Sequence, residues 1–432
     1  MQPPAIPPTR RDVLRNALAG TAALGAGDWV RPRPVGAQTA RKYLTVGLIG
    51  CGGRGNGAAH DCLEAAAHLG NVDLKITALA DAFPDRLESV QQGLAKKGQN
   101  VPKDRCFTGF DAYKKLCATD VDIVLLATPP VFRPLHVAAA VAAGKHLFAE
   151  KPVAVDPVGC RAMYASGKLA EQKKLSIVAG TCLRHAAAYA AARKMVAEDK
   201  AIGAIRGGAF WYCTNRLWHR PRQAGWSDAE YLIRNWVNFN CMSGDHVVEQ
   251  YIHTLDMACW HMNAYPIAAV AIGGRARRQT GDQYDQFSID YEFANNVHVH
   301  GMCRQVNGCW GRANQGELWG EKGFVAFPGT VTDASRTKLP LPKLDWHGNM
   351  YVQEHAVLLD SIVQGKAVNQ VRDVTDSTLA AIMSRISAYT GQRVTWDEMM
   401  KSDLALKPSA ADFEGGEVKA PADDVLPVPG KA

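Results

Sequence analysis

The feature that most constrains this chain of 432 residues is a glycine-rich turn. Gly50, Gly52 and Gly55 follow an apolar run at 44–50 and precede a helix expected over 55–69. Glycine permits a tight turn and a close approach of ligand to backbone, and the helix directs free N–H groups toward that ligand. The pattern predicts the first unit of a parallel α/β sheet that binds a dinucleotide.

Strands and helices continue to alternate after this turn. Apolar runs predict strands at 74–80, 122–128, 145–150 and 175–180, and periodic segments predict helices at 84–97, 133–144 and 156–172. This alternation predicts an α/β fold with a Rossmann doubly wound parallel sheet. From 204 to 330 the runs are typical of strands, interrupted by a helix at 244–262, and helices follow at 351–364 and 374–390. We therefore expect a second, α+β domain with a large mixed or antiparallel open sheet.

Residues 1–37 have the pattern of an export leader. Thr9-Arg10-Arg11-Asp12-Val13-Leu14-Arg15 is typical of a twin-arginine signal peptide, and a weakly apolar run at 17–25 is too short to span a bilayer. Five Arg and two Asp in this leader account for +3 of the formal net charge of +7. We expect export of the folded protein to the periplasm or beyond, without a membrane span. A disordered basic tail is the alternative.

An acidic residue closes the second predicted strand. Asp81 lies where a carboxylate accepts hydrogen bonds from the adenosine ribose hydroxyls of a dinucleotide. It would repel a 2′-phosphate, so NAD is favoured over NADP, a preference that nearby Arg54 and Arg86 weaken. The expected cofactor contacts in this region are Gly50, Gly52, Gly53, Arg54, Gly55 and Asp81.

Two further strands end at the same sheet edge. Thr128 and Pro129 follow one of them and are expected on the nicotinamide side, and His136 on the next helix either contacts the cofactor or is a structural histidine. Glu150-Lys151-Pro152 follows the other strand. Lys151 beside the nicotinamide would polarise a substrate hydroxyl or carbonyl; the alternative is an exposed lysine that pairs with Glu150.

Four ionisable residues are concentrated in the helix predicted at 244–262. In a continuous helix His246, Glu249, His253 and Asp256 share one face, because spacings of three and four residues align. Such a face suits acid–base chemistry or a metal ion. We expect no metal, because no His-Glu-x-x-His motif is present and hydride transfer to a nicotinamide needs none. A solvated polar face is disfavoured, since the residues between them are largely apolar.

These motifs together resemble the glucose–fructose oxidoreductase/inositol dehydrogenase (Gfo/Idh/MocA) family over essentially all of residues 42–400. The family helix reads D-x-G-x-H-x-x-D, and here Glu249 and Tyr251 stand at its first Asp and its Gly. The departures imply a reshaped pocket. The resemblance implies an NAD-binding Rossmann domain at 42–155 and a substrate-binding α+β domain at 156–400. The remainder, 401–432, is rich in Pro, Ala and acidic residues, so we expect an extended tail there.

The same resemblance assigns roles to single residues. Lys151 and His253 are its catalytic pair, and Glu249 or Asp256 orients the substrate or His253. Arg184 matches an Arg found after the strand that follows Glu-Lys-Pro, and we expect it to contact cofactor or substrate.

Residues 216–236 are dense in Trp, Arg, His and Asn. Trp rings stack on sugars, while Arg and Asn bind hydroxyls. The segment resembles exported, Trp-rich family members, some related to glycoside hydrolase family 109; a subunit or domain interface is the alternative. The expected substrate contacts are Arg184, Tyr212, Trp218, Arg234, Asn235, Trp236 and His253.

The eleven cysteines are scattered and form no C-x-x-C motif, which favours buried thiols; a Cys303–Cys309 bridge is the alternative. No Lys/Arg cluster has interleaved aromatic residues, so nucleic acid is not an expected partner.

The expected activity is an NAD-dependent oxidoreductase that acts on a sugar or glycoside hydroxyl, in a homo-oligomer. Little free nicotinamide cofactor exists outside the cytoplasm, so the NAD is expected to stay bound and to be recycled. One alternative is a redox-neutral glycoside hydrolase working by oxidation, elimination, hydration and reduction. Another is a non-catalytic sugar-binding protein.

Overall fold

The computed structural model describes residues 42–422 and 425–430. The export leader predicted at 1–37 lies outside these residues. Within the described part, no helix combines the length and the apolar character that crossing a membrane requires.

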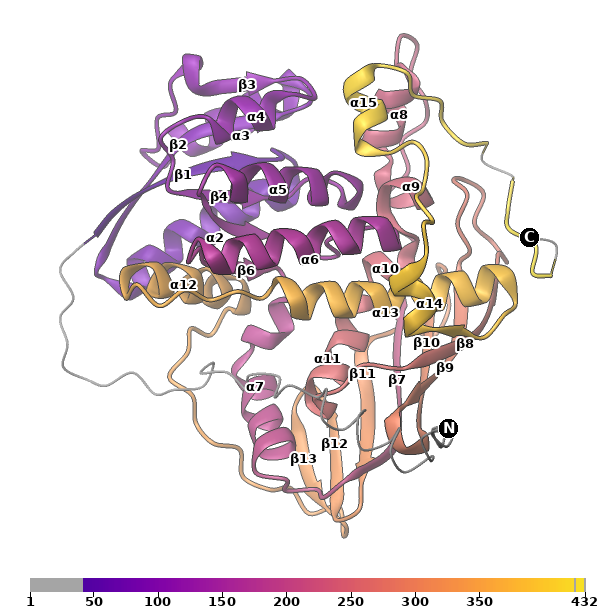
Figure 1. Cartoon of the computed structure of the whole chain (residues 1–432). Helices are drawn as coiled ribbons and strands as arrows, with labels where there is room; N and C mark the ends of the chain where they lie inside the picture. Colours follow the sequence, from indigo (N-terminus) through magenta and orange to yellow (C-terminus); the bar gives the residue numbers. More distant parts are fainter. Residues whose placement is uncertain (1–41, 423–424, 431–432) are drawn as a thin grey trace, which may run out of the picture. The chain divides into compact units, whose positions relative to one another are not determined.

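A six-stranded sheet forms the first domain (Figure 1). Its order is β3-β2-β1-β4-β5-β6, and every neighbouring pair is parallel, which confirms the predicted doubly wound sheet. The sequence does not predict β3, because three partly exposed residues carry little apolar pattern. The strands are β1 (Lys42–Ile49), β2 (Val72–Asp81), β3 (Cys106–Thr108), β4 (Ile123–Leu126), β5 (His146–Ala149) and β6 (Ile177–Ala179).

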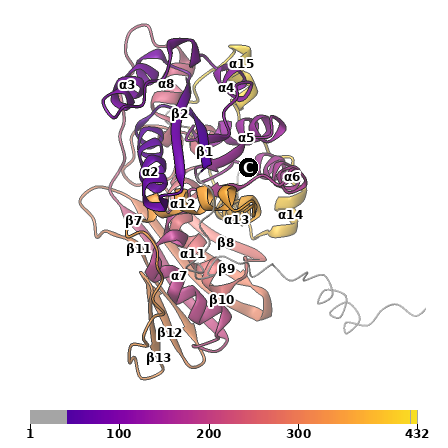
Figure 2. The same cartoon turned by 90° about the vertical axis from the view of Figure 1, so that its left-hand side faces the viewer.

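Helices cover both faces of this sheet, as Figure 2 shows. Successive strand residues point to opposite faces, so Leu48 lies in one core and Ile49 in the other. Burial on both faces explains why these strands have continuous apolar runs in the sequence. One face carries α2 (Gly53–Leu69), α3 (Pro84–Ala95) and α12 (Met350–Val363); the other carries α4 (Ala112–Cys117), α5 (Arg133–Ala142) and α6 (Pro157–Gln172).

The second domain is built on an eight-stranded sheet with the order β13-β12-β11-β7-β10-β9-β8-β14. Only β7 and β10 are parallel neighbours, so the sheet is mixed, as expected. Its strands are β7 (Ile205–Thr214), β8 (Ala268–Gly274), β9 (Gln286–Phe293), β10 (Val297–Gln305), β11 (Arg312–Gly320), β12 (Gly323–Phe327), β13 (Thr330–Asp333) and β14 (Val394–Thr395).

One face of the second sheet is open. The strand register aligns Ile272, Met302 and Trp211 across neighbouring strands, and Ile272 and Met302 are exposed. A homo-oligomer that pairs through this face stays a prediction.

A single long helix, α13 (Val371–Thr390), belongs to the cores of both domains. Val371 and Val374 pack in the Rossmann core, and Leu379 and Met383 pack in the core of the second sheet. Arg385, near its end, donates hydrogen bonds to the carbonyl oxygens of Val155 (2.8 Å) and Gly244 (3.0 Å). The helix therefore fixes the edge of the first sheet against the elements that carry His253.

The helix predicted at 244–262 is broken. It forms α10 (His246–Glu249) and α11 (Ile252–Met262), and a turn at Gln250 and Tyr251 separates the two helices. Tyr251 is fully buried, and its hydroxyl lies where a Cβ on Gly301 would be. His246 packs near Phe287 while Glu249 contacts Lys151, so the prediction that His246, Glu249, His253 and Asp256 share one face is wrong.

The C-terminal tail is not extended throughout, contrary to expectation, because it contains α15 (Ala410–Gly415). The Asp412 carboxylate accepts a hydrogen bond from the Ser409 backbone N–H (2.7 Å), which starts the helix. Phe413 is only 1% exposed and packs against the rings of Phe110 and Phe132. One aromatic residue in a polar, Pro-rich segment thus anchors the tail.

All eleven cysteines lie in the described part, and all are free thiols. Cys303 is buried in the second core and Cys309 is exposed, so the two are not bridged.

Candidate active site

The glycine-rich turn leaves open space in front of α2. A Cβ on Gly55 would lie 1.8 Å from the Gly50 carbonyl oxygen, and Gly50 itself has φ of +96°, so both positions require glycine. By contrast, Cβ atoms on Gly52 and Gly53 would meet nothing within 4 Å. The helix begins at Gly53 without a side-chain cap or an acidic first turn. Its free N–H groups therefore fit the pyrophosphate of a dinucleotide.

Asp81 ties this turn to the next one. Its carboxylate accepts hydrogen bonds from the backbone N–H groups of Cys51 (2.6 Å) and Phe83 (2.9 Å). Burial raises the pKa of Asp81. A carboxylate has about four acceptor positions, so these two bonds leave room for the expected ribose hydroxyls.

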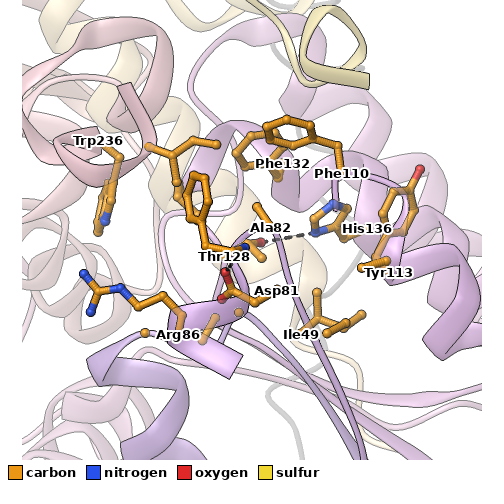
Figure 3. Close-up of a pocket in the computed structure, with 18 of the residues that line it drawn as sticks. Ile49, Asp81, Ala82, Arg86, Phe110, Tyr113, Thr128, Phe132, His136 and Trp236 are labelled. Carbon is orange, nitrogen blue, oxygen red and sulfur yellow. Dashed lines mark hydrogen bonds between the residues drawn. The ribbon is translucent and has the colours of Figure 1, made fainter. Parts of the chain in front are cut away.

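A cavity of about 500 Å³ extends from the glycine-rich turn past Asp81 (Figure 3). Thr128, Pro129 and His136 line it together with Asp81, so their expected contacts with the cofactor stay predictions. The Thr128 hydroxyl lies 3.3 Å from His136 Nδ1, and the ring of His136 stacks on Tyr113 at 4.2 Å. Burial lowers the pKa of His136 to about 3, so this histidine is neutral.

Residues 216–236, which we call the Trp/Arg segment, contribute side chains to this same cavity. Trp218, Arg234 and Trp236 line it together with Asp81, whereas Lys151 and His253 do not. Arg234 forms two hydrogen bonds of 3.1 Å with Asp85, at the start of α3. The geometry therefore does not support the sugar contacts expected of these residues. The ion pair with Asp85 holds the segment across the adenosine half of the cofactor site.

Asn235 holds the loop that carries this segment. It is fully buried, accepts a hydrogen bond from the Arg220 backbone N–H (2.7 Å) and donates one to the Arg220 carbonyl (3.0 Å). Both amide groups are engaged in this way, so Asn235 is not free to bind a sugar, contrary to the expectation.

Lys151 and Glu249 meet at the sheet edge beyond β5. Lys151 Nζ lies 2.9 Å from Glu249 Oε1 and also donates to the Glu249 carbonyl oxygen. Both side chains are largely buried. The adjacent Glu150 accepts a hydrogen bond from the Lys151 backbone N–H (3.1 Å) and pairs with Arg54. Lys151 is therefore held by Glu249 and does not pair with Glu150 through its side chain.

His253 lies in the first turn of α11, close to this lysine. Burial, followed by the charges of Lys151 and Arg54, holds the pKa of His253 well below its ordinary value. The imidazole is thus neutral and able to accept a proton. The ring centroids of Tyr212 and His253 are 6.4 Å apart, and the two rings are inclined by 25°. Tyr212, an expected substrate contact, therefore lies beside His253.

Asp256 and Arg184 form a buried ion pair. Arg184 Nε and Nη2 lie 2.9 and 2.7 Å from the two carboxylate oxygens of Asp256, and the Ser377 hydroxyl donates to the same carboxylate at 2.6 Å. The two residues are 8% and 1% exposed. This buried pair fixes α11 and hence His253, which is compatible with the expectation that Asp256 orients His253. The Arg184 guanidinium is engaged by Asp256, so its expected contact with cofactor or substrate stays a prediction.

His246 also lies apart from the site. Its Nδ1 is 2.9 Å from the Asp245 carboxylate, and its ring packs near Phe287 in the second core. Tyr251, which stands at the Gly of the family helix, is buried in that core too. It therefore does not line a pocket, although the departure was expected to reshape one.

Two residues that no sequence motif indicates, Tyr351 and Glu354, lie beside Arg54, an expected cofactor contact. Arg54 extends from the glycine-rich turn to Glu354 (2.8 Å), while the ring of Tyr351 lies 4.9 Å from its guanidinium. Glu354 is fully buried, which raises its pKa well above the ordinary value. Both Tyr351 and Glu354 belong to α12, about 200 residues from Lys151 in the chain, and no local pattern indicates them. Across residues 42–422 and 425–430, no group of three His, Cys, Asp or Glu side chains could hold a metal ion.

The ion pair between Arg184 and Asp256 can be tested by Asp256→Asn. We expect this change to lower the free energy of unfolding by roughly 3–5 kcal/mol, because it leaves a buried guanidinium without its main partner. Asp373→Asn is the matched control: Asp373 lies 3.1 Å from the same Arg184 but is more exposed, and its loss should cost about 1 kcal/mol or less. Denaturant unfolding measures both. Equal, small losses would argue against the positioning role.

Two family models match consecutive parts of the chain. The oxidoreductase family with an NAD-binding Rossmann fold matches residues 44–180, and the GFO/IDH/MocA C-terminal domain matches residues 189–326. Together they span more than half of the chain, and the strand–turn–helix at the glycine-rich turn lies within the first.

Individual proteins agree with this result. Inositol 2-dehydrogenase from Rhizobium meliloti is 24% identical over 326 residues, which are 73% of this chain and 87% of that protein. A glycosyl hydrolase family 109 protein from Shewanella amazonensis is 38% identical over 112 residues, only 26% of this chain and 23% of that protein. The solved structure of levoglucosan dehydrogenase with NADH and levoglucosan shares the fold, with a TM-score of 0.64 and 20% identity over 82% of this chain and 99% of that one. The chain therefore belongs to the Gfo/Idh/MocA oxidoreductase family and contains its NAD-binding Rossmann domain.

Proposed function

We propose that this protein oxidises a sugar or cyclitol hydroxyl with an NAD that stays bound between turnovers. The observation that carries the proposal is the grouping of Lys151, Glu249 and the buried His253 at the sheet edge that also holds the glycine-rich turn. Bound NAD supplies a hydride acceptor at this edge. The named activities of the inositol 2-dehydrogenase and levoglucosan dehydrogenase relatives support a substrate rich in hydroxyl groups.

The side chains divide the proton chemistry between them. His253 accepts the proton of the reacting hydroxyl, since its depressed pKa keeps it unprotonated at neutral pH. Lys151 stabilises the alkoxide that develops on that oxygen. Glu249 orients Lys151 through the 2.9 Å contact. A substrate oxygen that approaches Lys151 would take over one of the two hydrogen bonds that its ammonium makes with Glu249, and the other would remain.

Aromatic groups for a sugar ring come from Tyr212 and Tyr351 in this proposal. Tyr212 lies beside His253, and Tyr351 is partly exposed over Arg54. Aromatic faces pack against the C–H groups of sugars and leave the hydroxyls to polar partners. These two tyrosines take the place of the Trp/Arg segment in the initial expectation.

Replacement of the catalytic pair tests the proposal. Lys151→Met and His253→Gln should each slow reduction of NAD by an accepted sugar or cyclitol by about 10²–10⁴-fold, because each removes a group that acts on the reacting proton or oxygen. Lys168→Met and His300→Gln are exposed controls of the same chemical type. Absorbance of the reduced nicotinamide measures the rate. Wild-type rates in both active-site variants would overturn the assignment and favour a sugar-binding role.

Redox-neutral cleavage of a glycoside is a second candidate. The 38% identity to a glycosyl hydrolase family 109 protein favours it, although that similarity covers only 112 residues. In this cycle a ring hydroxyl is oxidised, the acidified neighbouring C–H loses its proton, the glycosidic bond is eliminated, water adds and the hydride returns. Net hydrolysis consumes no external oxidant, which suits a retained cofactor.

A glycoside panel in heavy water distinguishes the two candidates. Hydrolysis by this route should release the aglycone and introduce deuterium at carbon 2 of the sugar, because that position exchanges its proton with solvent. Absorbance and mass spectrometry follow the two events. Build-up of reduced nicotinamide in proportion to enzyme, with no aglycone released, would contradict the hydrolytic cycle and leave simple oxidation as the activity.

We also propose export by the twin-arginine route, which the Arg10-Arg11 pair of the leader supports. The double change Arg10→Lys/Arg11→Lys should retain the protein in the cytoplasm of a host with this pathway, whereas Arg15→Lys should not. Fractionation and immunoblotting measure the distribution. Equal export of both variants would argue against the proposal.

A further inference from the structure

A separate hydrophobic cluster covers the adenosine half of the cofactor cavity. It brings together three parts of the chain: residues around Phe132 from the first domain, α8 (Asp228–Arg234) with α9 (Asn240–Ser243), and the tail around Phe413. Ala410 and Glu414 of the tail line the cavity itself. Figure 1 shows α15 beside α8, and Figure 2 shows it beside α4. The cavity is therefore partly covered by segments that lie outside the Rossmann fold in the sequence.

The tail segment 402–422, which we call the strap, is attached to the first domain by polar contacts. Leu406 donates its backbone N–H to the Asp156 carboxylate at 2.9 Å. The Glu414 carboxylate accepts hydrogen bonds from the Tyr113 hydroxyl (2.8 Å) and from Lys114 Nζ (2.7 Å). Between these points Phe413 inserts among apolar side chains. The strap thus crosses the cavity wall from α6 to α4.

The opposite edge of the cavity is closed by the Trp/Arg segment. Arg234 bonds to Asp85 and stacks over the ring of Phe83 at 4.6 Å. The strap joins this segment, because the Ala420 backbone N–H donates to the Asp228 carboxylate at 2.8 Å. The strap and the Trp/Arg segment therefore form one connected structure beside the cavity.

We propose that the strap retains NAD: the adenosine leaves only when Phe413 and Glu414 detach from the first domain. The inference deepens the proposed function, and it rests on the part of that function in which NAD stays bound between turnovers. Neither residue lies at Lys151 or His253, so the strap controls the rate of cofactor release and not the proton chemistry. An adenosine held under this cover would let the enzyme work where no free NAD replaces a lost one.

Exchange of labelled NAD from the full-length protein tests the strap. The protein is loaded with isotope-labelled NAD, excess unlabelled NAD is added, and the retained label is followed in time. Glu414→Gln should speed release about tenfold, because it weakens a charge-assisted hydrogen bond. Phe413→Ala should speed it about a hundredfold through loss of buried contact. Glu417→Gln is the matched control: it makes the same chemical change in the strap at a residue that does not line the cavity, and it should leave the rate unchanged.

A partner variant separates the strap contact from general destabilisation. Lys114→Met removes the other half of the Glu414 ion pair without touching the cavity lining. Combined with Glu414→Gln, it should add little further speed to NAD release. Full additivity, or unchanged release in Glu414→Gln and Phe413→Ala, would overturn the proposal. Faster release with no sugar oxidised would instead uphold the strap and refute the proposed activity.

Discussion

The position of His253 depends on one buried ion pair. Asp256 lies one helical turn after His253 on α11, and Arg184 holds its carboxylate at two points while Ser377 of α13 holds it at a third. Removing a charged group from water is costly unless its partners are close and complete, so this contact tolerates little movement. Arg184 follows β6 of the first sheet. The ion pair therefore fixes α11, which carries His253, relative to the edge of that sheet.

The local patterns predict the architecture well because they depend on neighbouring residues. The glycine-rich turn, the apolar strands and the alternation of strand and helix all arise within short windows, and both sheets confirm them. The break at Gln250 could not be predicted in this way. Tyr251, at the break, packs under Gly301, a residue on a strand 50 positions later that no local pattern connects with it. Periodicity alone therefore groups His246 with residues from which the fold separates it.

Local sequence patterns indicate some residues of the candidate site and miss others for the same reason. Lys151, Glu249 and His253 were found from motifs, and the structure brings them together. Trp218 and Trp236 have the chemistry of a sugar platform, but an ion pair between Arg234 and Asp85, 149 residues apart, carries their segment to the cofactor. Tyr351, Glu354 and Phe413 had no local signal at all. Residue chemistry indicates what a side chain can bind, and only distant contacts determine what it meets.

The course of α13 through two cores has a mechanical consequence. Many two-domain enzymes admit their ligands by swinging one domain away from the other on flexible connections. Here such a swing would have to bend a helix of 20 residues or pull Val371 or Leu379 out of close packing. Both motions are costly in a well-packed interior. Ligand entry in this protein is therefore a matter of small side-chain and loop displacements at the rim, with the two sheets acting as one stiff frame.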